Sequence, residues 1–178
     1  MSEDIKCKTV RYKIDIDLYK HEALMLQENK CEYLADYQLS MDVSDETSVS
    51  IVYDTSRFEE LYLHSFKSVD EVFHMLEKLI RTLCKLDNYL IRDTIIDYNP
   101  HHIYIEKASG RIYLILASSS DRTDNLISLI NRFGLIRSIP GIQIAIANIL
   151  DTIESQQLSL QSLLLTLEKM NHRRMIVS

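Results

Sequence analysis

The sequence is poor in the residues that build irregular or phosphate-binding loops. Its 178 residues include 3 Gly, 2 Pro and no Trp. Long irregular loops are therefore not expected, and a glycine-rich phosphate loop is hard to assemble. The three glycines stand at positions 110, 134 and 141. No glycine-rich lid is therefore expected in the N-terminal half of the chain.

Cysteine is scarce as well. Cys7, Cys31 and Cys84 are odd in number and widely spaced, and no C-x-x-C pair is present. This pattern supports neither a zinc ribbon nor a redox dithiol, and it favours reduced structural thiols. The adjacent His101 and His102 come without the Cys or carboxylate pattern typical of a metal site. We therefore expect no metal ion and no cofactor.

Positive charge and long apolar runs are also lacking. The chain has 20 Lys and Arg against 26 Asp and Glu, a formal net charge of -6. Nucleic-acid affinity rests largely on Lys and Arg contacts, so no nucleic-acid partner is expected. The short basic run at 172–174 is interpreted as a solvated tail. With no run of about 18 apolar residues and no signal peptide, we expect no membrane span and a cytoplasmic location.

Hydrophobic residues are plentiful, at 46% of the chain. This is enough for one core, and the length indicates a single domain over residues 1–178. We expect a small β-rich N-terminal lobe at about 1–66 and a mainly helical C-terminal lobe at about 67–178.

The N-terminal lobe is expected to consist mainly of strands. Residues 10–18 alternate apolar and polar side chains, as a half-buried strand does. Residues 49–53 are rich in β-branched and aromatic residues, which favours a further strand. We also expect a strand over 22–27, a short helix over 33–41 and a polar loop over 44–48.

The second half of the chain is expected to be mostly helical. Ser68 and Glu71 form a capping-box pattern before an apolar stripe that runs from Val69 to Leu86, and this helix should end near residue 88. A hairpin is predicted over 102–117, with Gly110 in its turn. Three more helices are expected, capped by Ser120 or Asp121, by Ser138 and by Ser159. The first should be closed by Gly134, with Ile127 among its inward residues, and the second, apolar nearly all round, should be buried. The fold class is therefore α+β, with N-terminal antiparallel strands, an amphipathic helix, a loop, a β-hairpin and C-terminal helices.

This order of elements resembles the protein kinases around their catalytic loop. Residues 95–105 read IIDYNPHHIYI, which is similar to the kinase segment H-R-D-L-x-P-x-N. Asp97 falls at the catalytic Asp, Pro100 at the usual Pro, and His102 at the metal-binding Asn. The second metal ligand of kinases, the Asp of D-F-G, would fall near Ile115 and Leu116. The resemblance implies a degenerate kinase-like arrangement in which Asp97 and His102 are vestigial and no enzyme activity remains.

Residues 12–170 also resemble an uncharacterised bacterial domain that precedes forkhead-associated (FHA) domains in Gram-positive bacteria. A more distant similarity is to the pseudokinase-like cytoplasmic domain of EssB from type VII secretion. The segments that carry the resemblance are SIVYDTS at 50–56, YLI at 89–91, the block 96–105 and GRIYLI at 110–115. No FHA domain follows within the 178 residues. The resemblance implies a kinase-like fold that is used for protein contacts.

Three functional hypotheses follow. The first is a non-catalytic protein-interaction domain, a pseudokinase-like scaffold in a bacterial signalling or secretion assembly. Leu163, Leu164 and Leu167 of the last helix would meet a protein partner or a second copy in a homodimer. The second is a nucleotide-binding or phosphotransfer enzyme, with Asp97 as base and His102 as a metal or phosphate contact. The third is a regulator that binds a peptide by strand addition, with residues 10–18 as the candidate edge strand.

Overall fold

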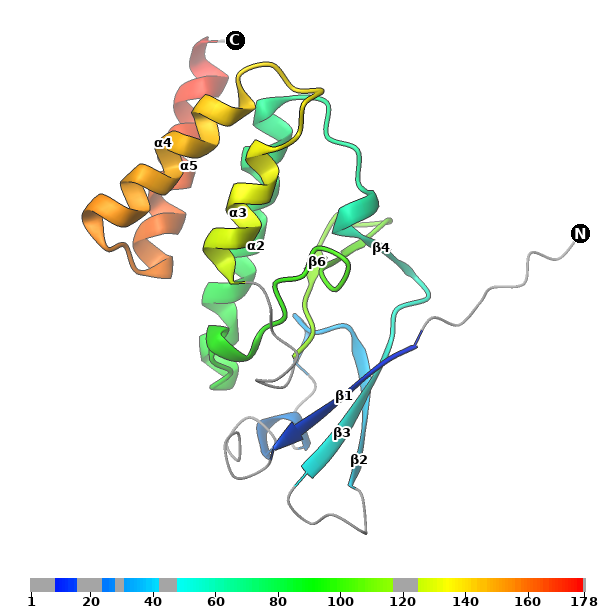
Figure 1. Ribbon diagram of the computed structural model, residues 1–178. Coiled ribbons are helices and arrows are strands. Elements are labelled where there is room, and N and C mark those ends of the chain that lie inside the picture. Colours follow the sequence, from blue (N-terminus) through cyan, green and yellow to red (C-terminus); the bar gives the residue numbers. More distant parts are fainter. Residues whose placement is uncertain (1–8, 16–23, 28–30, 42–47, 117–124, 178) are drawn as a thin grey trace, which may run out of the picture. The chain divides into compact units, whose positions relative to one another are not determined.

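The computed structural model describes residues 9–15, 24–27, 31–41, 48–116 and 125–177 (Figure 1). It contains helices and two antiparallel sheets, so the α+β class is confirmed. The chain forms two compact units, Met1–Leu63 with Lys85–Thr123, and His64–Cys84 with Asp124–Ser178. These bounds differ from the lobes expected at 1–66 and 67–178. The predicted hairpin lies in the same unit as the N-terminal strands, because its first strand pairs with residues 58–60.

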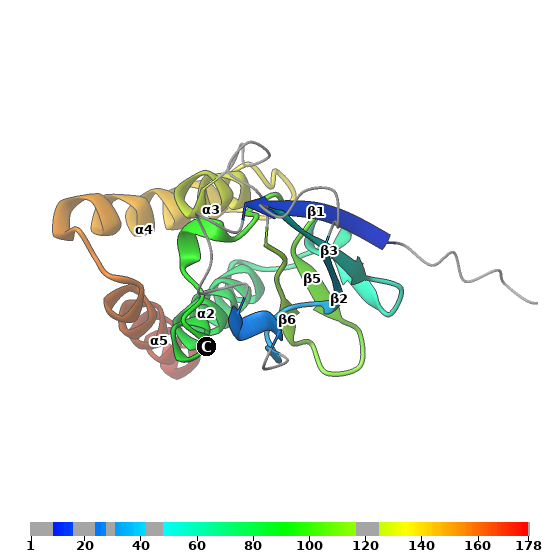
Figure 2. The same ribbon diagram turned by 90° about the horizontal axis from the view of Figure 1, so that it is seen from below.

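The first sheet contains β1 (Thr9–Asp15), β2 (Asp36–Met41) and β3 (Ser48–Asp54). Figure 2 shows them in the order β1-β3-β2, and both outer strands are antiparallel to β3. Tyr53 of β3 lies opposite Val10 on one side and Tyr37 on the other. The strands predicted at 10–18 and 49–53 are confirmed, the first as far as Asp15. Residues 16–18 lie outside the described residues, as do 44–47 of the expected polar loop.

Two local predictions in this region were wrong. Residues 24–27 are helical rather than extended, and residues 22 and 23 lie outside the description. Leu, Met and Gln are good helix formers, and a short apolar run does not separate helix from strand. The expected helix at 33–41 is instead the strand β2. Pairing with β3 decides its conformation, since strand preference depends mainly on neighbouring strands.

The second sheet joins β4 (Phe58–Glu60) to the hairpin of β5 (Tyr104–Glu106) and β6 (Ile112–Tyr113). The predicted hairpin is confirmed, with Tyr104 opposite Tyr113. Gly110 in its turn has a φ of 65°, a conformation that glycine adopts without steric cost. The chain after β6 runs beside the segment before β2, where Leu34 and Leu114 form a parallel bridge.

The helix α2 (Val69–Leu86) confirms the strongest helix prediction. Ser68 Oγ accepts a hydrogen bond from Glu71 N at 3.1 Å, and Glu71 Oε2 accepts one from Lys67 N at 2.7 Å. These contacts satisfy amide groups that the first helical turn leaves without partners. The predicted apolar stripe is buried except for Val69, which is half-buried.

Three helices follow in the second unit: α3 (Leu126–Gly134), α4 (Ile142–Gln156) and α5 (Leu160–Val177) (Figure 1). The cap of α5 is Ser159, as predicted, and its Oγ accepts from Ser162 N at 3.2 Å. The other two caps differ from the prediction, because Asn125 caps α3 and Gly141 precedes α4. Ser138 lies before that start, and Ser120 and Asp121 lie outside the described residues.

Two further expectations about these helices are corrected. Ile144 of α4 is 69% exposed and Ile127 of α3 is exposed, so α4 is not buried all round and Ile127 does not point inward. Each helix buries one face only, with Ile142, Ala145, Ile146 and Ile149 inside on α4. The basic run at 172–174 lies within the helix α5. Among the described residues, no helix combines the length and apolar character needed to cross a lipid bilayer.

Candidate functional site

The candidate site is the loop that runs from Asp97 to His102 in the first unit. It follows the short 3-10 helix η3 (Asp93–Ile95) and leads into β5. The loop begins at a fixed point, because Asp97 N donates to Ile115 O at 3.0 Å and Ile96 bridges to Leu116. Its start is therefore held by the strand segment that follows β6.

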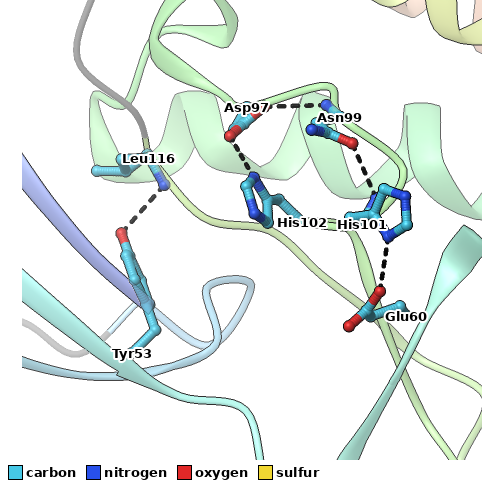
Figure 3. Close-up of polar contacts among 7 residues, drawn as sticks. All are labelled: Tyr53, Glu60, Asp97, Asn99, His101, His102 and Leu116. Carbon is cyan, nitrogen blue, oxygen red and sulfur yellow. Dashed lines mark hydrogen bonds and ion pairs between the residues drawn. The ribbon is translucent and has the colours of Figure 1, made fainter. Parts of the chain in front are cut away.

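Asp97 is held inside this loop by two neighbours. Its Oδ1 accepts a hydrogen bond from Asn99 N at 2.9 Å, and its Oδ2 lies 2.7 Å from His102 Nδ1 (Figure 3). Asp97 is only 4% exposed. A buried carboxylate needs such partners, because an uncompensated charge away from water is very costly. Sequence reasoning placed Asp97 and His102 in one loop, and the structure brings their side chains together.

A second histidine–carboxylate pair lies beside the first. His101 Nδ1 is 2.9 Å from Glu60 Oε2, and Glu60 is a buried residue of β4 (Figure 3). The ring of His101 also packs on Tyr62, with centroids 4.0 Å apart. Asn99 Oδ1 accepts from His101 N at 3.1 Å and so shapes the turn. Glu60 was missed at the sequence level, because nothing local pairs it with a residue 41 positions away.

The segment opposite the loop is anchored by Tyr53. Its hydroxyl accepts a hydrogen bond from Leu116 N at 3.0 Å, inside the core (Figure 3). Burial raises the pKa of Tyr53 far above its usual value, so this group stays a neutral hydroxyl. The loop therefore lies on a scaffold fixed by β3, β4 and the segment after β6.

The chemistry available to this loop follows from these contacts. His102, the position that the kinase resemblance would assign to the metal-binding Asn, has its ring bound to Asp97. Ile115 and Leu116, near which the resemblance would put the second metal ligand, are fully buried apolar residues. Within the described part of the chain, no group of three or more His, Cys, Asp or Glu side chains could hold a metal ion. The polar side chains of the loop bind one another, and His101 binds Glu60 of β4.

The three leucines of α5 that were expected to bind a partner differ in how deeply they are buried. Leu163 and Leu167 are buried, at 4% and 1% exposure, and Leu164 is half-buried. Leu165 is 56% exposed. Leu163 and Leu167 therefore lie inside the fold and not on a surface open to a partner, which corrects that expectation for both. Leu163 and Leu167 are four positions apart, a spacing that places both on the helix face that packs against the core.

The chain was compared with known proteins at three levels. No family model, no curated protein and no solved structure matches it. The family resemblance of residues 12–170 therefore stays a prediction.

Proposed function

We propose that this chain is a non-catalytic protein-interaction domain, a pseudokinase-like scaffold of a bacterial signalling or secretion assembly. One observation carries the non-catalytic part: both carboxylate oxygens of Asp97 are engaged inside the protein, by Asn99 and by His102. The bacterial setting and the kind of assembly rest on the sequence resemblance alone.

The engagement of Asp97 argues against a direct role in phosphoryl transfer. In a kinase, the equivalent carboxylate faces the acceptor hydroxyl, and neighbouring ligands hold Mg²⁺ against the phosphates. Here the carboxylate is buried, and its oxygens face the chain's own amide and imidazole groups. Turning it toward a substrate would break both contacts, which is costly for a buried charge. Asp97 is therefore suited to bracing the loop.

The experiment compares the wild-type chain with Asp97→Asn and with the exposed control Asp87→Asn. A ligand that binds the folded state raises Tm by mass action. We expect millimolar Mg·ATP to leave Tm unchanged in all three proteins. Without nucleotide, Asp97→Asn should lower the free energy of unfolding by about 1–3 kcal/mol, because a charge-assisted hydrogen bond is lost. Asp87→Asn should stay within about 0.5 kcal/mol of the wild type.

The same measurements decide on the enzyme alternative, in which Asp97 is a base and His102 a metal or phosphate contact. That alternative requires a rise in Tm with Mg·ATP that Asp97→Asn abolishes, together with phosphate release or transfer. Such a rise, or an Asp97→Asn variant as stable as the wild type, would overturn our proposal.

A second candidate function, peptide binding by strand addition, is favoured by the sheet order. In the described part of the chain, β1 pairs with β3 alone and forms an edge of the sheet. An edge strand exposes a row of backbone groups that an extended peptide can pair with. Hydrogen exchange of the β1 amides should slow when a partner binds in this way. Exchange that stays equally fast in the complex would exclude β1 as the docking strand.

A further inference from the structure

The strand β1 is an edge of the first sheet and carries two cations at alternate positions. In the described part of the chain it pairs with β3 alone (Figure 1). The register places Arg11 opposite Val52 and Lys13 opposite Ser50. Successive residues of a strand alternate between the two faces of a sheet, so both cations occupy the same face. The residue opposite each cation in β3 is therefore uncharged.

The intervening positions of β1 belong to the buried face of the sheet. Val10 lies opposite Tyr53, and Tyr12 lies opposite Ile51. Both of these β3 residues are fully buried. Residues directly opposite one another in neighbouring strands share a face. A strand added at the β1 edge would therefore meet apolar positions on the buried face and cations on the other.

The charges of β1 do not suit a second copy of this chain. Antiparallel pairing of two β1 strands over all seven residues centres on Tyr12 and puts Arg11 of one copy opposite Lys13 of the other. Like charges directly opposite one another are destabilising, and cations on an edge strand discourage self-pairing. The other edge, β2, has Gln38 and Ser40 level with the two cations. The two edges of the sheet therefore differ in the partner that they select.

We propose that the β1 edge binds an extended segment of a partner protein in which acidic residues alternate with apolar ones. Added antiparallel to β1, such a segment places acidic residues opposite Arg11 and Lys13 and apolar residues at the positions between them. Asp15, at the end of β1, favours a basic residue in the partner. Asp54 of β3 is one strand further away, and its Oδ1 accepts a hydrogen bond from Ser56 N at 3.0 Å. This inference rests on peptide binding by strand addition and names the chemistry of the partner.

The test uses the full chain and two fluorescein-labelled heptapeptides, which are titrated by anisotropy. The matched peptide, Lys-Val-Glu-Val-Glu-Val-Thr, complements Thr9–Asp15 residue by residue when it runs antiparallel to β1. The swapped peptide, Glu-Val-Lys-Val-Lys-Val-Thr, keeps the apolar positions and reverses the charges. We expect saturable binding of the matched peptide that is at least tenfold tighter than binding of the swapped peptide, or about 1.4 kcal/mol.

Methylation of the peptide backbone separates strand addition from simple charge attraction. In an antiparallel pair, the amides of alternate residues face the partner strand. One form of the matched peptide is N-methylated on its three valines, and a second form on its Lys and Glu residues. We expect one form to lose binding and the other to keep it.

Charge reversal in the chain should reverse the preference between the peptides. The double variant Arg11→Glu with Lys13→Glu should bind the swapped peptide more tightly than the matched one. Lys107→Glu with Arg111→Glu is the control, because both residues are exposed cations outside β1, and it should keep the wild-type order. A charge-reversed, folded chain that still prefers the matched peptide would contradict the role of the two cations.

Three results with the wild-type chain would each overturn the inference without any variant: no binding of the matched peptide, equal affinities for the two peptides, or equal effects of the two N-methylated forms. Misfolding of the charge-reversed chain therefore leaves the test intact. A failure here leaves the Mg·ATP result untouched, whereas a rise in Tm with Mg·ATP would refute the proposed function whatever the peptides do.

Discussion

The hydroxyl of Tyr53 accepts a hydrogen bond from Leu116 N at 3.0 Å, across 63 positions of sequence. Both residues are fully buried. Tyr53 lies on the central strand of the first sheet, and Leu116 bridges to Ile96, the residue before Asp97. One side-chain hydrogen bond thus joins the first sheet to the segment that positions the candidate site.

Removing the Tyr53 hydroxyl tests this link. Tyr53→Phe should lower the free energy of unfolding by about 1–3 kcal/mol, because the buried Leu116 amide loses its acceptor. Tyr62→Phe is the control, since Tyr62 is exposed and should change the value by less than about 0.5 kcal/mol. Urea unfolding followed by circular dichroism gives both numbers. Equal stability of the two variants would show that the Tyr53 contact contributes nothing.

A polar cluster between α2 and α5 predicts how stability depends on pH. Burial would raise the pKa of Glu77, but hydrogen bonds from Arg81 at 2.7 Å and Asn171 at 2.5 Å outweigh it and hold the pKa below its ordinary 4.5. A lowered folded-state pKa stabilises the fold above the unfolded-state value, and this stabilisation is lost as the pH falls through the folded-state value. Glu77→Gln should therefore be less stable than the wild type at pH 7.

This difference should shrink as the pH falls below 4.5. Urea titrations at several pH values measure it, with the exposed Glu154→Gln on α4 as the control. A wild-type advantage over Glu77→Gln that stayed constant from neutral pH to pH 3 would contradict the assignment.

The buried and exposed leucines of α5 provide a matched pair. Leu163→Ala should cost about 2–5 kcal/mol, because it leaves a cavity in the core. Leu165→Ala on the same helix should cost less than about 1 kcal/mol, since that side chain is mostly exposed. Light scattering on the wild type and on Leu165→Glu tests the homodimer. A dimer dissociated by Leu165→Glu would place the interface on the exposed face of α5, and a monomer at all concentrations would refute self-association.

Gly141 is a position where backbone conformation alone sets the cost of substitution. Its φ is 78°, and an added Cβ would meet no atom within 4 Å. Gly141→Ala should therefore destabilise the chain by roughly 1–2 kcal/mol through left-handed strain and not through a clash. Gly141→Asn should be milder, because Asn tolerates this conformation better. Thermal unfolding gives the Tm of both variants. A Tm lowered as much by Gly141→Asn as by Gly141→Ala would exclude left-handed strain as the cause.

Local signals in the sequence predicted the elements that depend on local chemistry. The capping pattern of Ser68 and Glu71 marked the start of α2, and Gly110 marked the turn of the hairpin. The strand β2 could not be predicted in the same way, because its pairing with β3 outweighs its weak intrinsic preference. Glu60 could not be found either, since its partner His101 comes close only when β4 pairs with β5. The Asp97–His102 contact was within reach of the sequence because both residues lie in one loop.

The discontinuous first unit has a consequence for synthesis on the ribosome. β4 pairs with β5 in its sheet, and β5 begins at Tyr104, 44 residues after β4 ends at Glu60. A nascent chain that has emerged only as far as α2 therefore carries β4 without its partner, with an unpaired strand edge of the kind that promotes aggregation. Protein fragments cut at the end of the N-terminal strands should share this defect. Co-expression of residues 85–116 as a separate chain would supply the missing β5 and β6 to such fragments.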